Sequence, residues 1–339
     1  PGNDRLLCIF NKIAIVVTKV RLRVLTLAPE WMQSWAFRLC GSRYSPASQV
    51  NRIFLLRHSN NSEKLRWTME LSGVQFHEVP VAIFAARPTA LYHSLGASDQ
   101  LPLISTSEDH GIFKNPADMT AHLSKARWRA WLYPEGAREL EDMFEAEFGR
   151  AALRVAYAYI FEEGMQPETM GMLKRGLPLW QRLLVPTLGR GVLQAMNERC
   201  RLQKELQANL KTIENTFRLV EGMLSDGRSY LCGDSISAAD VAFAALAFPV
   251  LLPEETADRF LPYDPRSLPR EYVEIIKSLR SREGGIFALR LYSNKRSRGD
   301  HVTPAGRLSR RGRSFTLRQN INRITHDLRM QRGDRRATL

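Results

Sequence analysis

The spacing of apolar positions changes once along the chain. Up to about residue 125, short apolar runs alternate with helix-like stretches, and Pro80 marks one strand as an edge or bulged strand. The predicted elements are a strand at 52–58, a helix at 62–72, strands at 76–83, 100–106 and 112–113, and a helix at 116–123. This order of elements indicates a small α/β unit.

Beyond residue 133 the strand signals nearly vanish. Apolar residues there recur at helical spacing, and the stretch 237–252 is apolar on nearly every side, which is typical of a buried helix. The predicted helices lie at 137–163, 208–227, 237–252 and 270–296, the last being a pair that meets near Gly284 and Gly285. The pattern therefore predicts an all-helical second unit.

Charge is unevenly distributed along the chain. The 339 residues carry a formal net charge of +14, but residues 51–294 hold 29 basic and 30 acidic side chains. Residues 1–50 hold seven basic residues against two acidic ones, and residues 295–339 hold thirteen against three. The predicted folded part is thus nearly neutral, and the basicity belongs to the two ends.

Each basic end has two readings. The acid-poor composition of 1–50 fits a plastid or mitochondrial transit segment, and equally a disordered extension of a cytoplasmic protein. The Arg-, Gly- and Ser-rich stretch 295–339 is typical of a solvated disordered tail, with nucleic acid or an acidic membrane as a weaker alternative partner.

The four cysteines are widely spread and show no CxxC spacing. This pattern argues against a disulfide framework or a structural zinc site and fits a reducing compartment. The histidines show no metal-ligand spacing either, so no metal is expected. No apolar run approaches the roughly 18 residues that a membrane span needs.

The stretch "RHSNNSEKLRW" (57–67) carries the candidate chemistry, because it places Ser59 and Ser62 at a predicted strand-to-helix corner. These hydroxyls can cap the first turn of the helix. They can equally hold an anion, such as a thiolate, where backbone N–H groups favour negative charge. The residues of the corner leave both interpretations open.

Another motif, "GDSISAADVAF" (233–243), has a structural meaning. Ser237 can cap the buried helix while the Asp240 side chain returns to the backbone, which is the reciprocal arrangement of a capping box.

The α/β-then-helical plan and three local stretches resemble the glutathione transferase superfamily. The stretches are the corner with its flanks (57–81), "YHSLGASDQLPLI" (92–104) and "YLCGDSISAADVAFAAL" (230–246). The resemblance covers about 52–294. It implies a thioredoxin-like α/β domain at 52–125 and an all-α helical-bundle domain at 133–294, between a basic extension (1–50) and a basic tail (295–339).

The resemblance also implies site residues. Ser59 falls where serine-type members donate a hydrogen bond to the sulfur of glutathione, and Ser62 lies one helical turn later. Pro102 matches the family's cis-proline, and the backbone of Leu101 would bind the cysteinyl part of glutathione. The implied activity is transfer of the glutathione thiolate onto a small electrophile, as in detoxification, by an enzyme that is often a homodimer.

The sequence departs from the family at one anchor. Where members place an acidic residue and a serine to hold the γ-glutamyl carboxylate, this chain has Asn115 and Pro116. Proline offers neither a hydroxyl nor an N–H, and each lost charge-assisted bond is worth about 1.5–3 kcal/mol. The alternative function is therefore a non-catalytic binding or scaffold protein with a degraded glutathione site.

Overall fold

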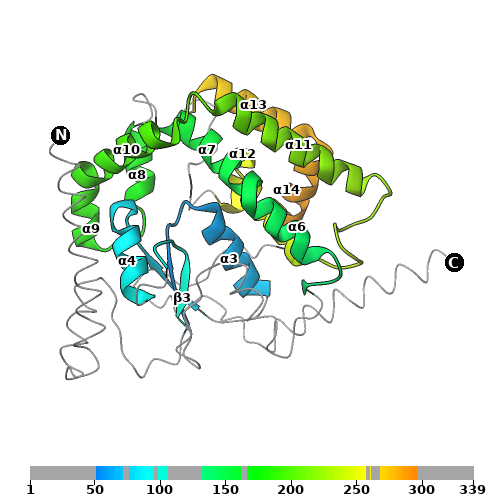
Figure 1. Cartoon of the computed structure of the whole chain (residues 1–339), viewed down its shortest axis with the longest axis horizontal. Coiled ribbons are helices and arrows are strands. Elements are labelled where there is room, and N and C mark those ends of the chain that lie inside the picture. The colour runs from blue at the N-terminus through cyan, green and yellow to red at the C-terminus, as the bar shows by residue number, and fades with distance from the viewer. Residues whose placement is uncertain are drawn as a thin grey trace.

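The computed structural model describes residues 51–71, 76–94, 98–105, 132–161, 166–256, 260 and 268–295. It consists of a small sheet with two helices and a larger helical unit (Figure 1). Helix α3 (Asn60–Leu71) lies between the sheet and the helical unit and packs on α12 (Ala238–Leu251) and α7 (Gly149–Ile160). The predicted α/β-plus-helical fold class is confirmed for these residues.

The described sheet has three strands in the order β2-β1-β3. Strand β1 (Asn51–Leu55) pairs in parallel with β2 (Phe76–Pro80), and α3 forms the connection between them. It pairs antiparallel with β3 (Leu103–Ser105), with Phe54 opposite Leu103. The ends of β1 and β2 and the start of β3 therefore meet at one end of the sheet. Pro80 is the last residue of β2, an edge strand of this described sheet.

The remaining helices surround α12, whose residues are all buried. One group, α8 (Gln166–Lys174), α9 (Leu179–Leu184) and α10 (Arg190–Cys200), gathers at one end of the helical unit (Figure 1). The other elements are η1 (Ile83–Ala85), α4 (Ala86–His93), α6 (Ala137–Met143), η3 (Phe144–Phe148), η5 (Val185–Gly189), α11 (Leu206–Leu224), η6 (Glu254–Thr256), α13 (Arg270–Ser281) and α14 (Glu283–Lys295). Within the described ranges, no helix is both long and apolar enough to cross a bilayer.

The main core is built of aromatic rings around Phe243 of α12. The ring of Phe148 stacks on it at a centroid distance of 5.4 Å, and the ring of Phe217 from α11 meets it edge-on, also at 5.4 Å. Offset and edge-to-face pairs of this kind are favourable beyond the apolar area that they bury. The rings thus join η3, α11 and α12 into one body.

The observed helices follow the predicted pattern with two differences. The helix predicted at 137–163 is divided by a π-helical turn at Phe144–Phe148, and the structure adds α4, α8, α9 and α10, where the pattern predicted no helix. The two helices predicted over 270–296 meet one turn before Gly285, at which a Cβ atom would overlap the carbonyl group of Leu279. The strand predicted at 112–113 and the helix at 116–123 lie outside the described residues.

Candidate functional site

Ser59 lies at the N-cap of α3, four residues after β1 ends. Its N–H donates to the carbonyl of Leu56 at 3.1 Å, and its own carbonyl accepts from the N–H of Glu63 at 3.1 Å. Within the described ranges, no backbone N–H of the first turn donates to the Ser59 hydroxyl, and the residue is 8% exposed. The backbone of Ser59 therefore starts the helix while its hydroxyl is left for another partner.

The Asn60 side chain bonds both to its own helix and to the helical unit. Its Oδ1 accepts from the N–H of Asn61 at 2.9 Å. Its Nδ2 donates to the carbonyl of Gly149 at 2.7 Å and to that of Leu246 at 3.3 Å, which belong to α7 and α12. The corner is thus held directly against the helical unit.

Gly149 permits this close contact. A Cβ atom at this position would lie 2.8 Å from Cδ2 of Leu246, which is closer than real Cβ atoms approach another heavy atom. Glycine therefore lets α7 approach α12 beside the Asn60 amide.

Ser62 is completely buried, and its Oγ has no hydrogen-bond partner among the residues that the structure describes. A buried polar atom without a partner is uncommon and costs about 1–3 kcal/mol. Ser62 therefore does not act as a cap either, and its hydroxyl lies one helical turn beyond that of Ser59.

His58 is the other buried polar group of the corner. It is 4% exposed, its Nε2 has no hydrogen-bond partner, and its ring centroid lies 6.4 Å from that of Tyr157. Burial, together with the positive charge of Arg66, lowers the pKa of His58 to about 4. The imidazole is therefore neutral at physiological pH.

This burial predicts a pH-dependent stability. The folded protein binds the His58 proton only near pH 4, whereas the unfolded chain binds it near 6.5, so the unfolded state holds more protons between these values. As the pH falls from 6.5 to 4, His58 should lower the free energy of unfolding by about 3 kcal/mol. Urea unfolding of the parent and of His58→Gln across this range measures the difference.

The comparison must be made between parent and variant, because another group acts in the opposite direction. Burial raises the pKa of Asp240 to about 6, which makes both proteins more stable as the pH falls from 6 towards 4. Burial also lowers the pKa of His77, which is half-buried on β2, so His77→Gln is the comparison and should reduce the parent's slope less than His58→Gln does. An identical slope in parent and His58→Gln would mean that folding does not depress this pKa.

Leu101 and Pro102 lie at the same end of the sheet as the corner. The peptide bond between them is cis, and Pro102 is buried directly before β3. Because Phe54 is opposite Leu103 in an antiparallel pair, the start of β3 runs beside the end of β1. The structure thus brings Ser59, Ser62, Leu101 and Pro102 to one end of the sheet, whereas Asn115 lies outside the described residues.

The side chain of Gln181 also contacts this end of the sheet. Gln181 of α9 is buried, and its Oε1 accepts from the N–H of Ala82, just after β2, at 2.7 Å. Nearby, a Cβ atom at Gly176 would lie 2.7 Å from Nη1 of Arg57. The segment 176–181 therefore packs against the corner, a contact that no sequence signal predicted.

Helix α3 buries two charged side chains, one against α6 and η3 and the other against β2. Lys64 Nζ donates to Oε1 of Glu141 on α6 at 2.7 Å and also to Glu145. Arg66 Nε donates to Oε1 of Glu78 on β2 at 2.7 Å. The sequence analysis missed both pairs, because charged residues in a helix are usually exposed.

The start of α12 shows the capping box in full. Ser237 Oγ accepts from the N–H of Asp240, while the Asp240 carboxylate accepts from the N–H of Ser237 at 2.7 Å and from the N–H of Leu231 at 2.8 Å. This arrangement is structural, since it satisfies buried backbone groups in front of the central helix.

In the part of the chain that the structure describes, no group of three or more His, Cys, Asp or Glu side chains could hold a metal ion. The candidate site brings together serine hydroxyls, a neutral imidazole and the backbone at one end of the sheet.

Comparison with known proteins agrees with this architecture. Residues 203–265 match the family model "Glutathione S-transferase, C-terminal domain". No curated protein sequence matches the chain.

Among solved structures, the chain is similar to a glutathione S-transferase of Ceriporiopsis subvermispora in complex with glutathione. The TM-score is 0.50 and the identity 15%, and the match covers 72% of this chain and 96% of that one. It is also similar to a glutathione transferase of Phanerochaete chrysosporium (TM-score 0.48, 13% identity, 72% and 96% covered). A beta-etherase of Sphingobium sp. strain SYK-6 is matched with a TM-score of 0.43, 14% identity, and 71% and 99% covered.

The resemblance stated from the sequence is thereby confirmed at the level of the fold. Residues 203–265 match the glutathione S-transferase C-terminal domain, and the described residues have the α/β-plus-helical fold of the glutathione S-transferase structure that the chain resembles.

Proposed function

We propose that this chain is a glutathione transferase-like enzyme of the serine type, in which the Ser59 hydroxyl donates a hydrogen bond to the sulfur of glutathione. The observation that carries the proposal is that this hydroxyl lies at the N-terminus of α3 and accepts no hydrogen bond from its own helix. A helix N-terminus favours negative charge through its free N–H groups. A thiolate held there would be stabilised by both effects.

The neighbouring residues support this assignment. Leu101 and Pro102, at the start of β3, would place the cysteinyl backbone of glutathione beside the corner. Ser62 supplies a second hydroxyl one turn away, with no partner of its own in the structure. Asn115 would meet the γ-glutamyl carboxylate without the usual serine, so weak binding is expected.

The chemistry needs only the thiolate and an electrophile. The glutathione thiol releases its proton to solvent, and the thiolate electron pair then forms a carbon–sulfur bond to a small electrophile. The leaving group departs with the electron pair of the broken bond. Ser59 contributes by lowering the pKa of the thiol, because its O–H stabilises the charged form. The proposal includes a homodimer, which light scattering tests.

A second candidate function is a non-catalytic scaffold with this fold. Two observations favour it: Ser59 is 8% exposed, which leaves little surface for a substrate, and Pro116 in the sequence lacks the N–H expected at the γ-glutamyl anchor. In that case the corner serines would be remnants of a thiol site.

Titration of the full chain with glutathione tests the proposal. Calorimetry gives the Kd, and the ultraviolet absorbance of the bound thiolate against pH gives the pKa of the thiol. We expect millimolar or tighter binding and a pKa below the 8.5 or so of a free thiol. In Ser59→Ala the pKa should rise by about 1–2 units, and kcat/KM toward a chloronitrobenzene should fall by about 10- to 100-fold.

Ser225→Ala is the matched control. Ser225 is an exposed serine that follows α11, and its hydroxyl donates only to the carbonyl of Gly222. This variant should behave as the parent does. Absence of binding at several millimolar glutathione would favour the scaffold function, and an unchanged thiol pKa in Ser59→Ala would remove Ser59 from the mechanism.

A further inference from the structure

Helix α9 exposes apolar side chains to the outside of the molecule. Leu179 and Leu183 are each 69% exposed, Leu184 is 38% exposed and Trp180 is 36% exposed. The other large apolar side chains that are exposed in the described ranges, Met143, Leu219 and Ile286, lie singly on three different helices. We call Leu179, Trp180, Leu183 and Leu184 the α9 patch. Their i, i+1, i+4 and i+5 spacing places these four side chains on one side of the helix.

A normal surface helix buries its apolar face and exposes its polar face, whereas α9 does the reverse. Its buried residue is the polar Gln181, whose Oε1 accepts from the N–H of Ala82. Turning the helix to bury its leucines would break this bond and leave a buried N–H without a partner. The leucines are therefore held outward by a contact at the end of the sheet.

The surroundings of the α9 patch are positively charged. No acidic residue occurs between positions 169 and 197, whereas this stretch includes Lys174, Arg182 and Arg190. Arg182 and Arg190 are exposed. Within the described part of the chain, none of these three cations forms an ion pair. Exposed leucines and a tryptophan next to exposed cations are the features of a helix that lies in the headgroup region of a bilayer.

We propose that the α9 patch docks on an anionic phospholipid membrane, with its leucines and Trp180 entering the interface and the flanking cations contacting lipid phosphates. Charge decides among the possible partners. A second copy of this chain would bring the same cations to the contact, and residues 1–50 are themselves basic. An anionic bilayer satisfies both the apolar stripe and the cations, and the two basic ends of the chain add to the attraction. This surface role is independent of the proposed glutathione chemistry.

Vesicle flotation of the full chain tests the proposal. The parent should float with vesicles of phosphatidylcholine and phosphatidylserine at least tenfold more than with phosphatidylcholine alone. Leu179→Ser/Leu183→Ser should lower the partition coefficient at least tenfold, since two leucines no longer leave water. Arg182→Gln/Arg190→Gln should weaken binding and reduce its dependence on salt.

Two single variants are the matched controls. Leu219→Ser and Ile286→Ser remove exposed apolar side chains elsewhere and should float as the parent does. Circular dichroism shows that each variant is folded. The proposal is overturned if the double leucine variant floats like the parent, because the basic ends alone would then explain binding, or if the parent binds no vesicles. It is also overturned if this variant instead converts a dimer to a monomer, or abolishes binding to a homopolymeric RNA without affecting flotation.

Discussion

Replacing Lys64 with methionine is expected to lower the free energy of unfolding by about 3–5 kcal/mol, because it breaks a buried ion pair from one side. Lys64 and Glu141 are each 1% exposed, and their charged atoms lie 2.7 Å apart. Without the ammonium group, Glu141 would keep only the hydrogen bond from the Tyr133 hydroxyl at 3.0 Å. Chemical unfolding at neutral pH measures the loss.

Two further variants test whether burial of the ion pair causes the loss of stability in Lys64→Met. Lys277→Met breaks an exposed pair with Glu274, at 3.1 Å, and should cost less than about 1 kcal/mol. Adding Glu141→Gln to Lys64→Met should recover part of the stability, since the uncompensated charge is removed while the amide oxygen still accepts from Tyr133. Equal losses in Lys64→Met and Lys277→Met would contradict the buried pair.

Asp240→Ala is expected to cost about 3–4 kcal/mol and to weaken the start of α12. The carboxylate accepts from the N–H groups of Leu231 and Ser237 at 2.8 and 2.7 Å and from the Ser237 hydroxyl at 2.6 Å. Alanine leaves two buried N–H groups without partners, each worth about 1–3 kcal/mol. Thermal and urea unfolding at pH 7 give the value.

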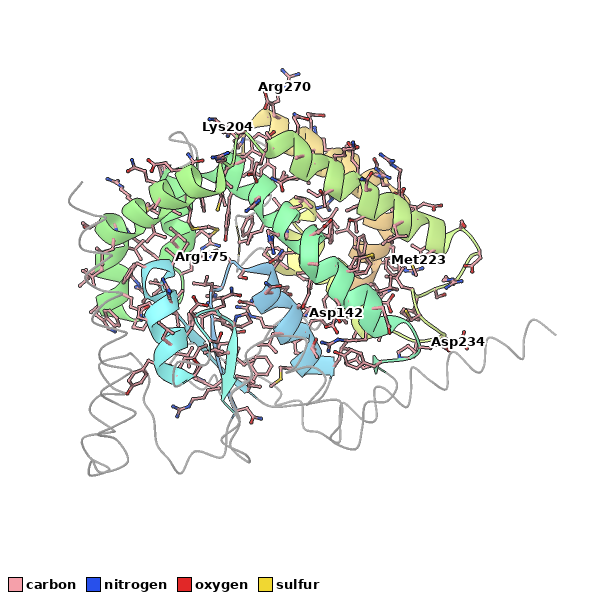
Figure 2. All side chains as sticks on the ribbon, viewed as in Figure 1. Asp142, Arg175, Lys204, Met223, Asp234 and Arg270 are labelled. Atoms are coloured by element: carbon pink, nitrogen blue, oxygen red, sulfur yellow. The ribbon has the colours of Figure 1, made fainter. Side chains whose placement is uncertain are left out.

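Asp142→Ala serves as the control for Asp240→Ala. Asp142 lies on α6 and is half exposed, and it accepts from Nε of Arg138 at 3.1 Å (Figure 2). Its removal should change the free energy of unfolding by less than about 1 kcal/mol. Ser237→Ala, which removes one side of the capping box, should cost about 1 kcal/mol. If Asp240→Ala were no worse than Asp142→Ala, the box would not stabilise α12.

Local patterns in the sequence predicted the elements whose residues interact with near neighbours. The apolar stripe of 208–227 corresponds to α11 at Leu206–Leu224, and the capping motif of Ser237 and Asp240 acts over three residues. Pro80 lies on an edge strand of the described sheet, because a proline cannot donate to a ladder. Caps, turns and periodicity are short-range effects, so one segment is enough to read them.

The corner was only partly predictable. The sequence placed Ser59 and Ser62 at a strand-to-helix turn but left capping and anion binding equally open. In the structure the Asn60 side chain accepts from the N–H of Asn61, and within the described ranges no N–H of the first turn donates to the hydroxyl of Ser59. Asn60 can be held this way because its amide reaches carbonyls 89 and 186 positions away, a contact that only the folded chain brings together.

The fold class and the order of most helices and strands could be read from the sequence, because apolar periodicity and capping are encoded within each segment. The choice of which faces are buried emerged only in the folded chain. Folding placed Lys64 and Arg66 inside, since α3 is enclosed between the sheet and α12, and it turned the leucines of α9 outward, since Gln181 is bound at the end of β2. Burial depends on partners far away in the chain, and no local pattern carries that information.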